Sequence, residues 1–292
     1  MLKVQHVIKS LRPTQWTKNL FIFASLIFAQ KFFDILLLLK TLAAFAIFCL
    51  LSGSLYILND VCDLEEDRFH PKKSKRPIAS GTISKYQALG IFILLSLSSL
   101  LLAFFLNRNF FVASLIYFLL QLFYSIKLKD VVILDVFIIA AGFVIRVIAG
   151  GLVIEVSLSS WLLICTILLA LFLSMSKRRH ELLLLEENAS SHRPILKEYS
   201  AYLLDQMIAV VTASTLIAYC LYTISEETIK KFGTKNLVFS TPFVLYGIFR
   251  YLYLIHQREK GGSPEELIIK DKPLLIDILL WIGTVIVILY FF

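Results

Sequence analysis

Nine long apolar segments dominate this 292-residue sequence and restrict it to a membrane fold. An apolar run of about 18 residues or more is long enough to cross the hydrocarbon core of a bilayer as a helix. The chain is 58% hydrophobic, which exceeds the usual share in soluble domains. We therefore expect an all-α integral membrane protein that forms one polytopic domain over residues 1–292. The nine expected helices cover approximately residues 19–37, 40–58, 87–106, 109–125, 132–153, 159–176, 202–224, 237–255 and 274–292.

The first segment is the weakest of the nine, because Lys31 and Asp34 interrupt it. It has some features of a signal peptide, but no convincing cleavage site follows it. We predict that it is a helix.

Basic residues are distributed unevenly between the two ends of these spans. Of the 29 Lys and Arg residues, 22 lie near the N-terminus or in and beside the loops at 59–86, 124–135, 177–200 and 256–273, and six lie at the opposite ends. The positive-inside rule places the N-terminus and these four loops in the cytoplasm, and an odd number of spans places the C-terminus outside. The net charge of +8 suits anionic lipid headgroups and phosphate ligands rather than nucleic acid, because the chain has no basic soluble domain.

An acidic stretch follows the second span directly. Asn59, Asp60, Asp63 and Asp67 are spaced so that they share one face of a helix. Carboxylates beside a membrane span are costly unless they have a partner. A hard divalent cation, usually Mg²⁺, is the natural partner for several carboxylates, and it commonly brings phosphates with it. The stretch therefore predicts chemistry on a phosphorylated substrate at the membrane surface.

The residues that follow are basic and complement this acidic stretch. Residues 68–76 carry five cations, namely Arg68, Lys72, Lys73, Lys75 and Arg76. The acidic half suits a metal and the basic half suits phosphate oxygens, so together they suit a metal–diphosphate complex. The alternative is a solvated loop whose charges pair with one another, but the spacing of the aspartates disfavours it.

Two further charged residues lie within the fifth span. Asp135 enters this span, and Arg146 follows eleven residues later, so both lie on one face about 16 Å apart along the axis. A charge at that depth costs several kcal/mol unless it faces a polar cavity. Two interpretations remain open: an internal ion pair without a ligand, and the polar wall of a buried site.

The loop after the sixth span begins with Lys177-Arg178-Arg179-His180-Glu181. This cluster is either a topology anchor or a second phosphate clamp, because Arg side chains bind phosphate oxygens in a forked geometry. Lys18, near the N-terminus, lies beside the interfacial anchor Trp16 and adds a possible phosphate donor.

Two motifs resemble those of the UbiA superfamily of intramembrane prenyltransferases. They are Asn-Asp-x-x-Asp-x-x-x-Asp at 59–67 and Arg-Pro-x-Ala-Ser-Gly at 76–81, and the resemblance extends over essentially the whole chain. It implies nine helices around a central cavity, in which two aspartate-rich motifs hold Mg²⁺ and a prenyl diphosphate.

The chain departs from that superfamily after the sixth span. A second Asp-x-x-x-Asp is usual there, but this sequence has Lys177-x-x-x-Glu181 with two arginines between them. This change is similar to the decaprenyl-phosphate phosphoribosyltransferase branch. So are Arg-Pro-x-Gln-Trp-x-Lys-Asn at 12–19, Tyr-Ser-x-x-Leu-Lys at 124–129 and Gly-Phe-x-x-Arg-x-x-Ala-Gly-Gly at 142–151.

The branch resemblance implies a reaction and a set of site residues. The donor would be 5-phosphoribosyl diphosphate, the acceptor a polyprenyl phosphate, and the cofactor Mg²⁺ held by Asp60, Asp63 and Asp67, with Asn59 beside them. The released product would be diphosphate, and the setting a bacterial inner membrane. The residues expected to contact substrate are Lys18, Arg68, Lys73, Arg76, Tyr124, Lys129, Asp135, Arg146, Lys177, Arg178, Arg179 and Glu181.

Two other functions compete with this interpretation. An ordinary prenyltransferase, which joins a prenyl diphosphate to an aromatic acceptor, shares the first motif but is expected to keep the second set of acids. A lipid or ion transporter is favoured only by Arg146 within a span. Against a transporter, the charges converge on one membrane face, and no two helices are broken in matching halves.

Overall fold

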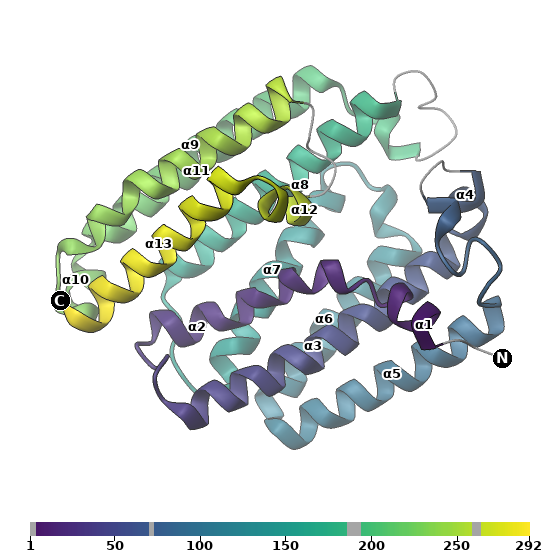
Figure 1. The fold of residues 1–292 in the computed structure, drawn as a ribbon, viewed down its shortest axis with the longest axis horizontal. Helices are drawn as coiled ribbons and strands as arrows, with labels where there is room; N and C mark the ends of the chain where they lie inside the picture. The colour runs from purple at the N-terminus through teal and green to yellow at the C-terminus, as the bar shows by residue number, and fades with distance from the viewer. Residues whose placement is uncertain (1–3, 70–72, 186–193, 259–263) are drawn as a thin grey trace.

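A computed structural model of the chain describes residues 4–69, 73–185, 194–258 and 264–292. Within these ranges the regular structure consists of α-helices and short 3₁₀ helices, with no β-strand. Figure 1 shows the long helices packed side by side in one bundle. This confirms the predicted all-α fold.

The N-terminal half contributes helices α1 to α7. Their bounds are α1 Val4–Ser10, η1 Pro13–Phe21, α2 Ile22–Phe28, α3 Ile35–Cys62, α4 Leu64–Phe69, η2 Lys73–Lys75, α5 Lys85–Leu106, α6 Arg108–Ile126, η3 Leu128–Asp130 and α7 Leu134–Val153. The C-terminal half contributes α8 Ser160–Leu185, η5 Pro194–Glu198, α9 Ala201–Ile224, α10 Glu226–Phe232, η6 Asn236–Ser240, α11 Thr241–Gln257, α12 Pro264–Lys270 and α13 Lys272–Phe291.

Eight helical segments in the described part of the chain are long and apolar enough to cross a membrane. They correspond to the second to ninth predicted spans. The first prediction, a single helix over 19–37, is wrong. A helical run made of η1 and α2 covers Pro13–Phe28, and the chain then turns before α3 begins at Ile35. The run is shorter than a full span but lies alongside α3 along much of the bundle (Figure 1).

The polar residues that weakened the first segment explain where it breaks. Asp34 is the N-cap of α3, and its carboxylate accepts hydrogen bonds from the backbone amides of Leu36 and Leu37. An N-cap satisfies amides that have no partner within the helix, so it favours a new helix start at this position. Lys31 lies in the same turn, outside both α2 and α3.

Helix α7 lies at the centre of the bundle. It packs against α2, α6 and α8, and most of its apolar segment is buried. Gly150 permits the contact with α2, because a Cβ atom added there would lie 2.1 Å from the backbone oxygen of Ile22. Helix α5, in contrast, exposes Leu94, Leu97 and Leu101, as expected of a helix that faces lipid.

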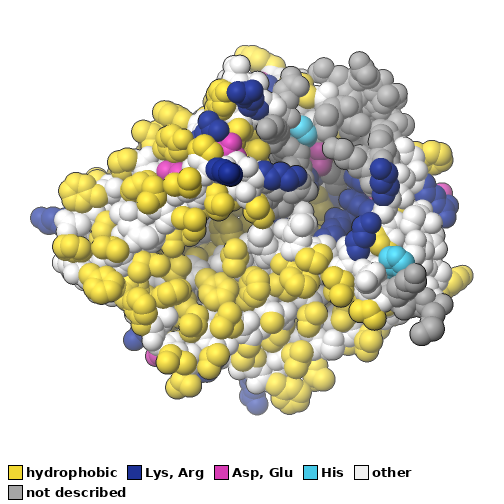
Figure 2. All heavy atoms as spheres, viewed as in Figure 1, with side chains coloured by type: hydrophobic (Ala, Val, Ile, Leu, Met, Phe, Trp, Pro, Cys, Tyr) yellow, Lys and Arg dark blue, Asp and Glu magenta, His cyan; other side chains and the backbone are white. Residues whose placement is uncertain are grey.

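The termini lie at opposite ends of the bundle (Figure 1). We call the end that carries α4 and the N-terminus the α4 end. Figure 2 shows one side of the bundle, which is covered mainly by hydrophobic side chains, with Lys and Arg gathered around a hollow towards the α4 end. This side of the surface is therefore amphiphilic, with a group of cations towards the α4 end.

Candidate functional site

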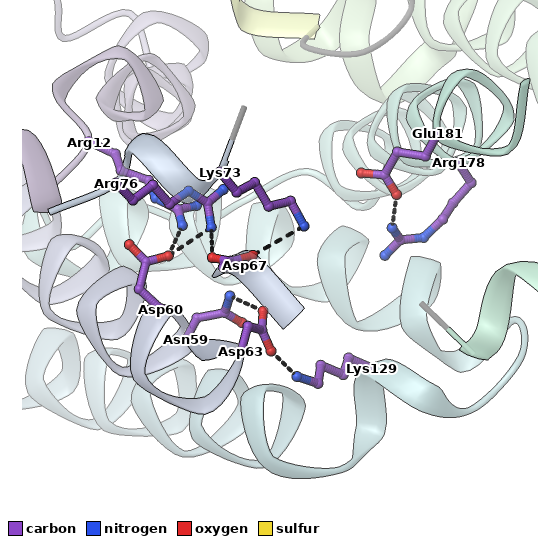
Figure 3. A network of polar contacts seen from close by, with 10 residues as sticks. All are labelled: Arg12, Asn59, Asp60, Asp63, Asp67, Lys73, Arg76, Lys129, Arg178 and Glu181. Carbon is purple, nitrogen blue, oxygen red and sulfur yellow. Dashed lines mark hydrogen bonds and ion pairs between the residues drawn. The ribbon is translucent and has the colours of Figure 1, made fainter. Parts of the chain in front are cut away.

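The acidic stretch lies at the α4 end, where α3 gives way to α4. Helix α3 ends at Cys62, Asp63 is its C-cap, and α4 starts at Leu64. The sequence predicted that the four polar residues share one helical face, and Asn59 and Asp63 are indeed hydrogen-bonded one turn apart, but the side chains do not all meet one partner. Asp60 and Asp67 still converge on a single partner, whereas Asp63 points towards a different one (Figure 3).

Asp60 and Asp67 are bridged by one guanidinium group. The Nη1 atom of Arg76 lies 2.9 Å from Oδ1 of Asp60 and 2.5 Å from Oδ2 of Asp67. Arg12 donates a second hydrogen bond to Asp60, and the Lys73 ammonium lies 3.5 Å from Oδ1 of Asp67. Both carboxylates are almost fully buried, with exposures of 2% and 1%. Such charges are tolerated inside a protein only when they are paired in this way.

The N-terminal segment brings Arg12 to this cluster. Arg12 adopts a left-handed backbone conformation with φ of 50° between α1 and η1, and its guanidinium stacks on the ring of Tyr56 at 5.1 Å from the ring centroid. Our selection of site residues from the sequence missed Arg12, although it belongs to the motif at 12–19. Nothing in that motif identifies a carboxylate 48 residues away as its partner.

Asp63 belongs to a separate part of the site. One of its oxygens accepts a hydrogen bond of 2.8 Å from the Asn59 side chain, and the other accepts one from Lys129. Burial lowers the pKa of Lys129, but the hydrogen bond and charge of Asp63 outweigh this effect and leave the pKa above its ordinary value. Lys129 is therefore a fully charged ammonium at neutral pH. It links the loop between α6 and α7 to the end of α3.

The carboxylates provide oxygen ligands suitable for a hard divalent cation, but they are not arranged as a preformed cage. Among the described residues, no three His, Cys, Asp or Glu side chains form a group that could hold a metal ion. One oxygen nevertheless fits a metal ligand: Oδ1 of Asp67 is buried and accepts no hydrogen bond. With a carboxylate oxygen of Asp60, it would offer Mg²⁺ the ligand type that this ion prefers.

A second polar cluster joins α7, α8 and the segment before α9. Arg178 on α8 is 2% exposed and contacts Asp135 at 2.6 Å and Glu181 at 2.5 Å. It also donates a hydrogen bond to Tyr124, while Tyr199 donates one of 2.8 Å to Asp135. Burial raises the pKa of Tyr199 to about 12, so its hydroxyl remains a donor at neutral pH. Figure 3 shows Arg178 and Glu181 on α8, to one side of the acidic cluster.

This arrangement changes the interpretation of the basic cluster on α8. The sequence left two interpretations of Lys177, Arg178 and Arg179 open, a topology anchor and a phosphate clamp. Two carboxylates already contact Arg178, and Arg179 forms an ion pair with Asp205 on α9. Tyr199 and Asp205 were not identified from the sequence, because their partners lie 64 and 26 residues away.

Arg146 is separate from Asp135, so the internal ion pair considered from the sequence is absent between these two residues. Asp135 contacts Arg178, whereas Arg146 donates hydrogen bonds of 2.8 Å each to Asn19, Tyr117 and the backbone oxygen of Gly142. Its guanidinium also lies 4.7 Å from the ring centroid of Tyr117. Arg146 thus joins α6, α7 and η1 through neutral partners.

Three further residues predicted to contact substrate are Arg68, Lys18 and Lys177. Arg68 forms a solvent-exposed pair with Glu65 on α4, at 3.2 Å. Lys18 on η1 and Lys177 on α8 are both half-buried. The α4 end therefore presents two polar clusters: the carboxylates with Arg12, Lys73, Arg76 and Lys129, and the group around Arg178.

Comparison with known proteins identifies relatives along nearly the whole chain. Residues 19–178 match the model of the UbiA prenyltransferase family. Decaprenyl-phosphate phosphoribosyltransferase of Mycolicibacterium smegmatis is 34% identical, over 99% of this chain and 93% of that protein. The protein of the same name from Mycobacterium tuberculosis is 30% identical, over 97% and 93%.

Solved structures share the fold. A UbiA homologue from Archaeoglobus fulgidus bound to GPP and Mg²⁺ superposes with a TM-score of 0.74 at 19% identity, covering 97% of this chain and 99% of that one. A structure of digeranylgeranylglyceryl phosphate synthase has a TM-score of 0.68 at 20% identity and covers 99% of both chains.

Proposed function

Because this chain belongs to the UbiA prenyltransferase family, we propose that it is a phosphoribosyltransferase acting on a lipid phosphate. It would transfer 5-phosphoribosyl from phosphoribosyl diphosphate to a polyprenyl phosphate such as decaprenyl phosphate, and release diphosphate. The name shared by its full-length relatives supports this reaction. The observation that carries it is the pairing of buried carboxylates with several cations at one end of a lipid-exposed bundle.

The donor diphosphate is proposed to bind at the acidic cluster. Asp60 and Asp67 would hold Mg²⁺, and Arg12, Lys73 and Arg76 would contact phosphate oxygens. Bound there, Mg²⁺ would neutralise the charge that develops on the leaving diphosphate. Arginine and lysine beside the carboxylates provide the charge-assisted hydrogen bonds that phosphate requires.

Asp63 is assigned a different role from the other two aspartates. Both of its oxygens already accept hydrogen bonds from protein groups, so we treat it as a positioning residue rather than a metal ligand. It would hold the Lys129 ammonium beside the bound phosphates. Arg178 would similarly position Tyr124 and Glu181, because its own charge is balanced by two carboxylates.

The proposed reaction is a single displacement at the ribose. An oxygen of the lipid phosphate attacks C1, the bond from C1 to the diphosphate oxygen breaks, and diphosphate leaves with the bonding electrons. The configuration at C1 is inverted. No covalent enzyme nucleophile is required, because the acceptor phosphate is already ionised at neutral pH.

The amphiphilic surface supports such a pair of substrates. The hollow with its surrounding cations suits a phosphorylated, water-soluble donor, and the hydrophobic surface beside it suits a polyprenyl chain (Figure 2). We place the α4 end in the cytoplasm, since most Lys and Arg residues lie at that end of the predicted spans. A soluble sugar phosphate would then reach the site directly.

A donor comparison tests this proposal. Purified protein would receive Mg²⁺, a polyprenyl phosphate and labelled phosphoribosyl diphosphate, and the lipid fraction would be counted. Label should appear in the lipid. Absence of label, combined with transfer of a prenyl group from a prenyl diphosphate to an aromatic acid, would replace this proposal with ordinary prenyl transfer.

A further inference from the structure

Arg76 lies where two buried carboxylates converge. Its Nη1 atom is within 2.9 Å of both Asp60 and Asp67, which come from different helices. A single positive group thus bridges the ends of α3 and α4 (Figure 3). A divalent cation held by the same two residues would have to occupy the same region.

The surrounding charges make this position unfavourable for a metal ion alone. Arg12 also contacts Asp60, and Lys73 lies 3.5 Å from Asp67. Two carboxylates therefore face three cations, so an added divalent ion would meet a net positive charge. Metal binding requires either that cations leave or that further anions arrive.

One buried carboxylate oxygen of this cluster has the Lys73 ammonium 3.5 Å away but no hydrogen bond. Oδ1 of Asp67 accepts no hydrogen bond, although the residue is only 1% exposed. Buried polar atoms without a hydrogen bond are rare and costly, and they often mark a site for an ion or water. The cluster therefore combines the Arg76 bridge between Asp60 and Asp67 with a neighbouring carboxylate oxygen that could accept a further ligand.

We propose that Arg76 occupies the divalent-cation position of the free protein and turns from the two carboxylates to the diphosphate when metal and diphosphate bind together. The inference rests on the proposed function only in that the donor is a diphosphate. Arg76 thereby makes the two ligands depend on each other: the diphosphate supplies the anion that attracts the guanidinium, and the metal supplies the cation that the carboxylates then lack.

The consequence is positive coupling between metal and diphosphate. The metal alone, or the diphosphate alone, must break the ion pairs of Arg76 with Asp60 and Asp67 to bind. When both bind together, the metal replaces Arg76 at the carboxylates and the diphosphate becomes the new partner of Arg76. Coupling between sites commonly changes affinity by about 5- to 150-fold, and the same factor applies in both directions. Removal of the Arg76 charge should raise affinity for the metal alone and reduce the coupling.

The coupling between metal and diphosphate can be tested by measuring metal binding to the full chain in detergent, with no catalytic reaction taking place. Radioactive Mn²⁺ would be measured by equilibrium dialysis, with and without saturating inorganic diphosphate, using free Mn²⁺ in the protein-free chamber as the reference. In the wild type, diphosphate should raise Mn²⁺ affinity about tenfold or more. Arg76→Gln should bind Mn²⁺ alone about tenfold more tightly than the wild type and should respond less to diphosphate.

Lys75→Gln is the matched control, because it removes the same charge one residue earlier from an exposed side chain. It should behave like the wild type. Equal Mn²⁺ affinity of the wild type and Arg76→Gln, or an equal gain in Lys75→Gln, would overturn the inference. If Arg76→Gln elutes as an aggregate, Arg12→Gln tests the same exchange at Asp60, and no gain in Mn²⁺ affinity there would also overturn it.

These ligands contain neither ribose nor lipid, so the result is independent of the group transferred. Coupling without phosphoribosyl transfer would overturn the proposed reaction and leave the role of Arg76 intact. Transfer without coupling would overturn the role of Arg76 alone.

Discussion

The buried group around Arg178 allows a quantitative test of how the α8 wall is held. Arg178→Gln would leave the carboxylate of Asp135, which has 0% exposure, with a hydrogen bond of 2.8 Å from the Tyr199 hydroxyl but without its cationic partner. Removing one partner of a buried ion pair typically costs about 3–5 kcal/mol, because the other charge remains buried. Asp135→Asn should cost less, about 1.5–3 kcal/mol, since Arg178 keeps Glu181 at 2.5 Å.

The double variant should be less destabilised than the sum of the single variants. Arg178→Gln with Asp135→Asn removes both buried charges, so the uncompensated carboxylate no longer exists. We expect a coupling energy of about 2 kcal/mol, within the range found for residues in one network. Unfolding free energies in mixed micelles with increasing SDS would measure it, with Arg68→Gln at the exposed pair as a control that changes stability by less than about 1 kcal/mol.

An additive result would refute this reasoning. If the double variant loses as much stability as the two single variants together, Arg178 and Asp135 do not stabilise each other. Arg178 would then be available to contact a ligand, as the sequence alone suggested.

Three further outcomes are expected. Gly150→Ala should lower the free energy of unfolding by at least about 2 kcal/mol, because the added Cβ would lie 2.1 Å from the Ile22 oxygen. Gly90→Ala, where a Cβ would meet no atom within 4 Å, should raise it by about 0.5–1 kcal/mol in the same unfolding assay. Asp67→Asn should lower transfer activity at least about tenfold and weaken Mn²⁺ binding in the presence of diphosphate. The pKa of Lys129 is raised in the folded protein, so the stability that its charge contributes should be complete at neutral pH and lost as the pH rises through this folded-state pKa. Thermal melts of the wild type and Lys129→Met should therefore converge in strong alkali.

Hydropathy predicted the membrane spans well, because a long apolar run has few alternatives to a helix in lipid. It failed at the first segment, where local polar chemistry decides the structure. Asp34 caps α3, and the chain turns before it instead of continuing as one helix. Lys31 and Asp34 mark this position in the sequence, and Asp34 is a residue type that favours a helix start.

The sequence predicted which carboxylates gather in the acidic stretch, but it predicted their arrangement in space only in part. Residues seven apart on a helix lie on one side, so the convergence of Asp60 and Asp67 could be foreseen. The divergence of Asp63 could not, because it depends on where α3 ends and on the approach of Lys129 from another loop. Local spacing carries no information about such distant partners.

The α8 cluster shows the same limit more strongly. Its sequence indicates a basic surface, yet Arg178 is buried against Asp135 and Glu181, and Arg179 is paired with Asp205. The acids that neutralise the two arginines come largely from other helices. The charge of a segment therefore did not predict the charge of the site that it forms.

The most direct test of the proposed reaction follows each part of the donor separately. Phosphoribosyl diphosphate would carry one label in the ribose, a second in the 5-phosphate and a third in the diphosphate, and would be supplied with Mg²⁺ and decaprenyl phosphate. Ribose and 5-phosphate labels should enter the lipid fraction in equal molar amounts, while the diphosphate label stays in water. Entry of the diphosphate label into the lipid, or retention of all three labels in water, would contradict phosphoribosyl transfer.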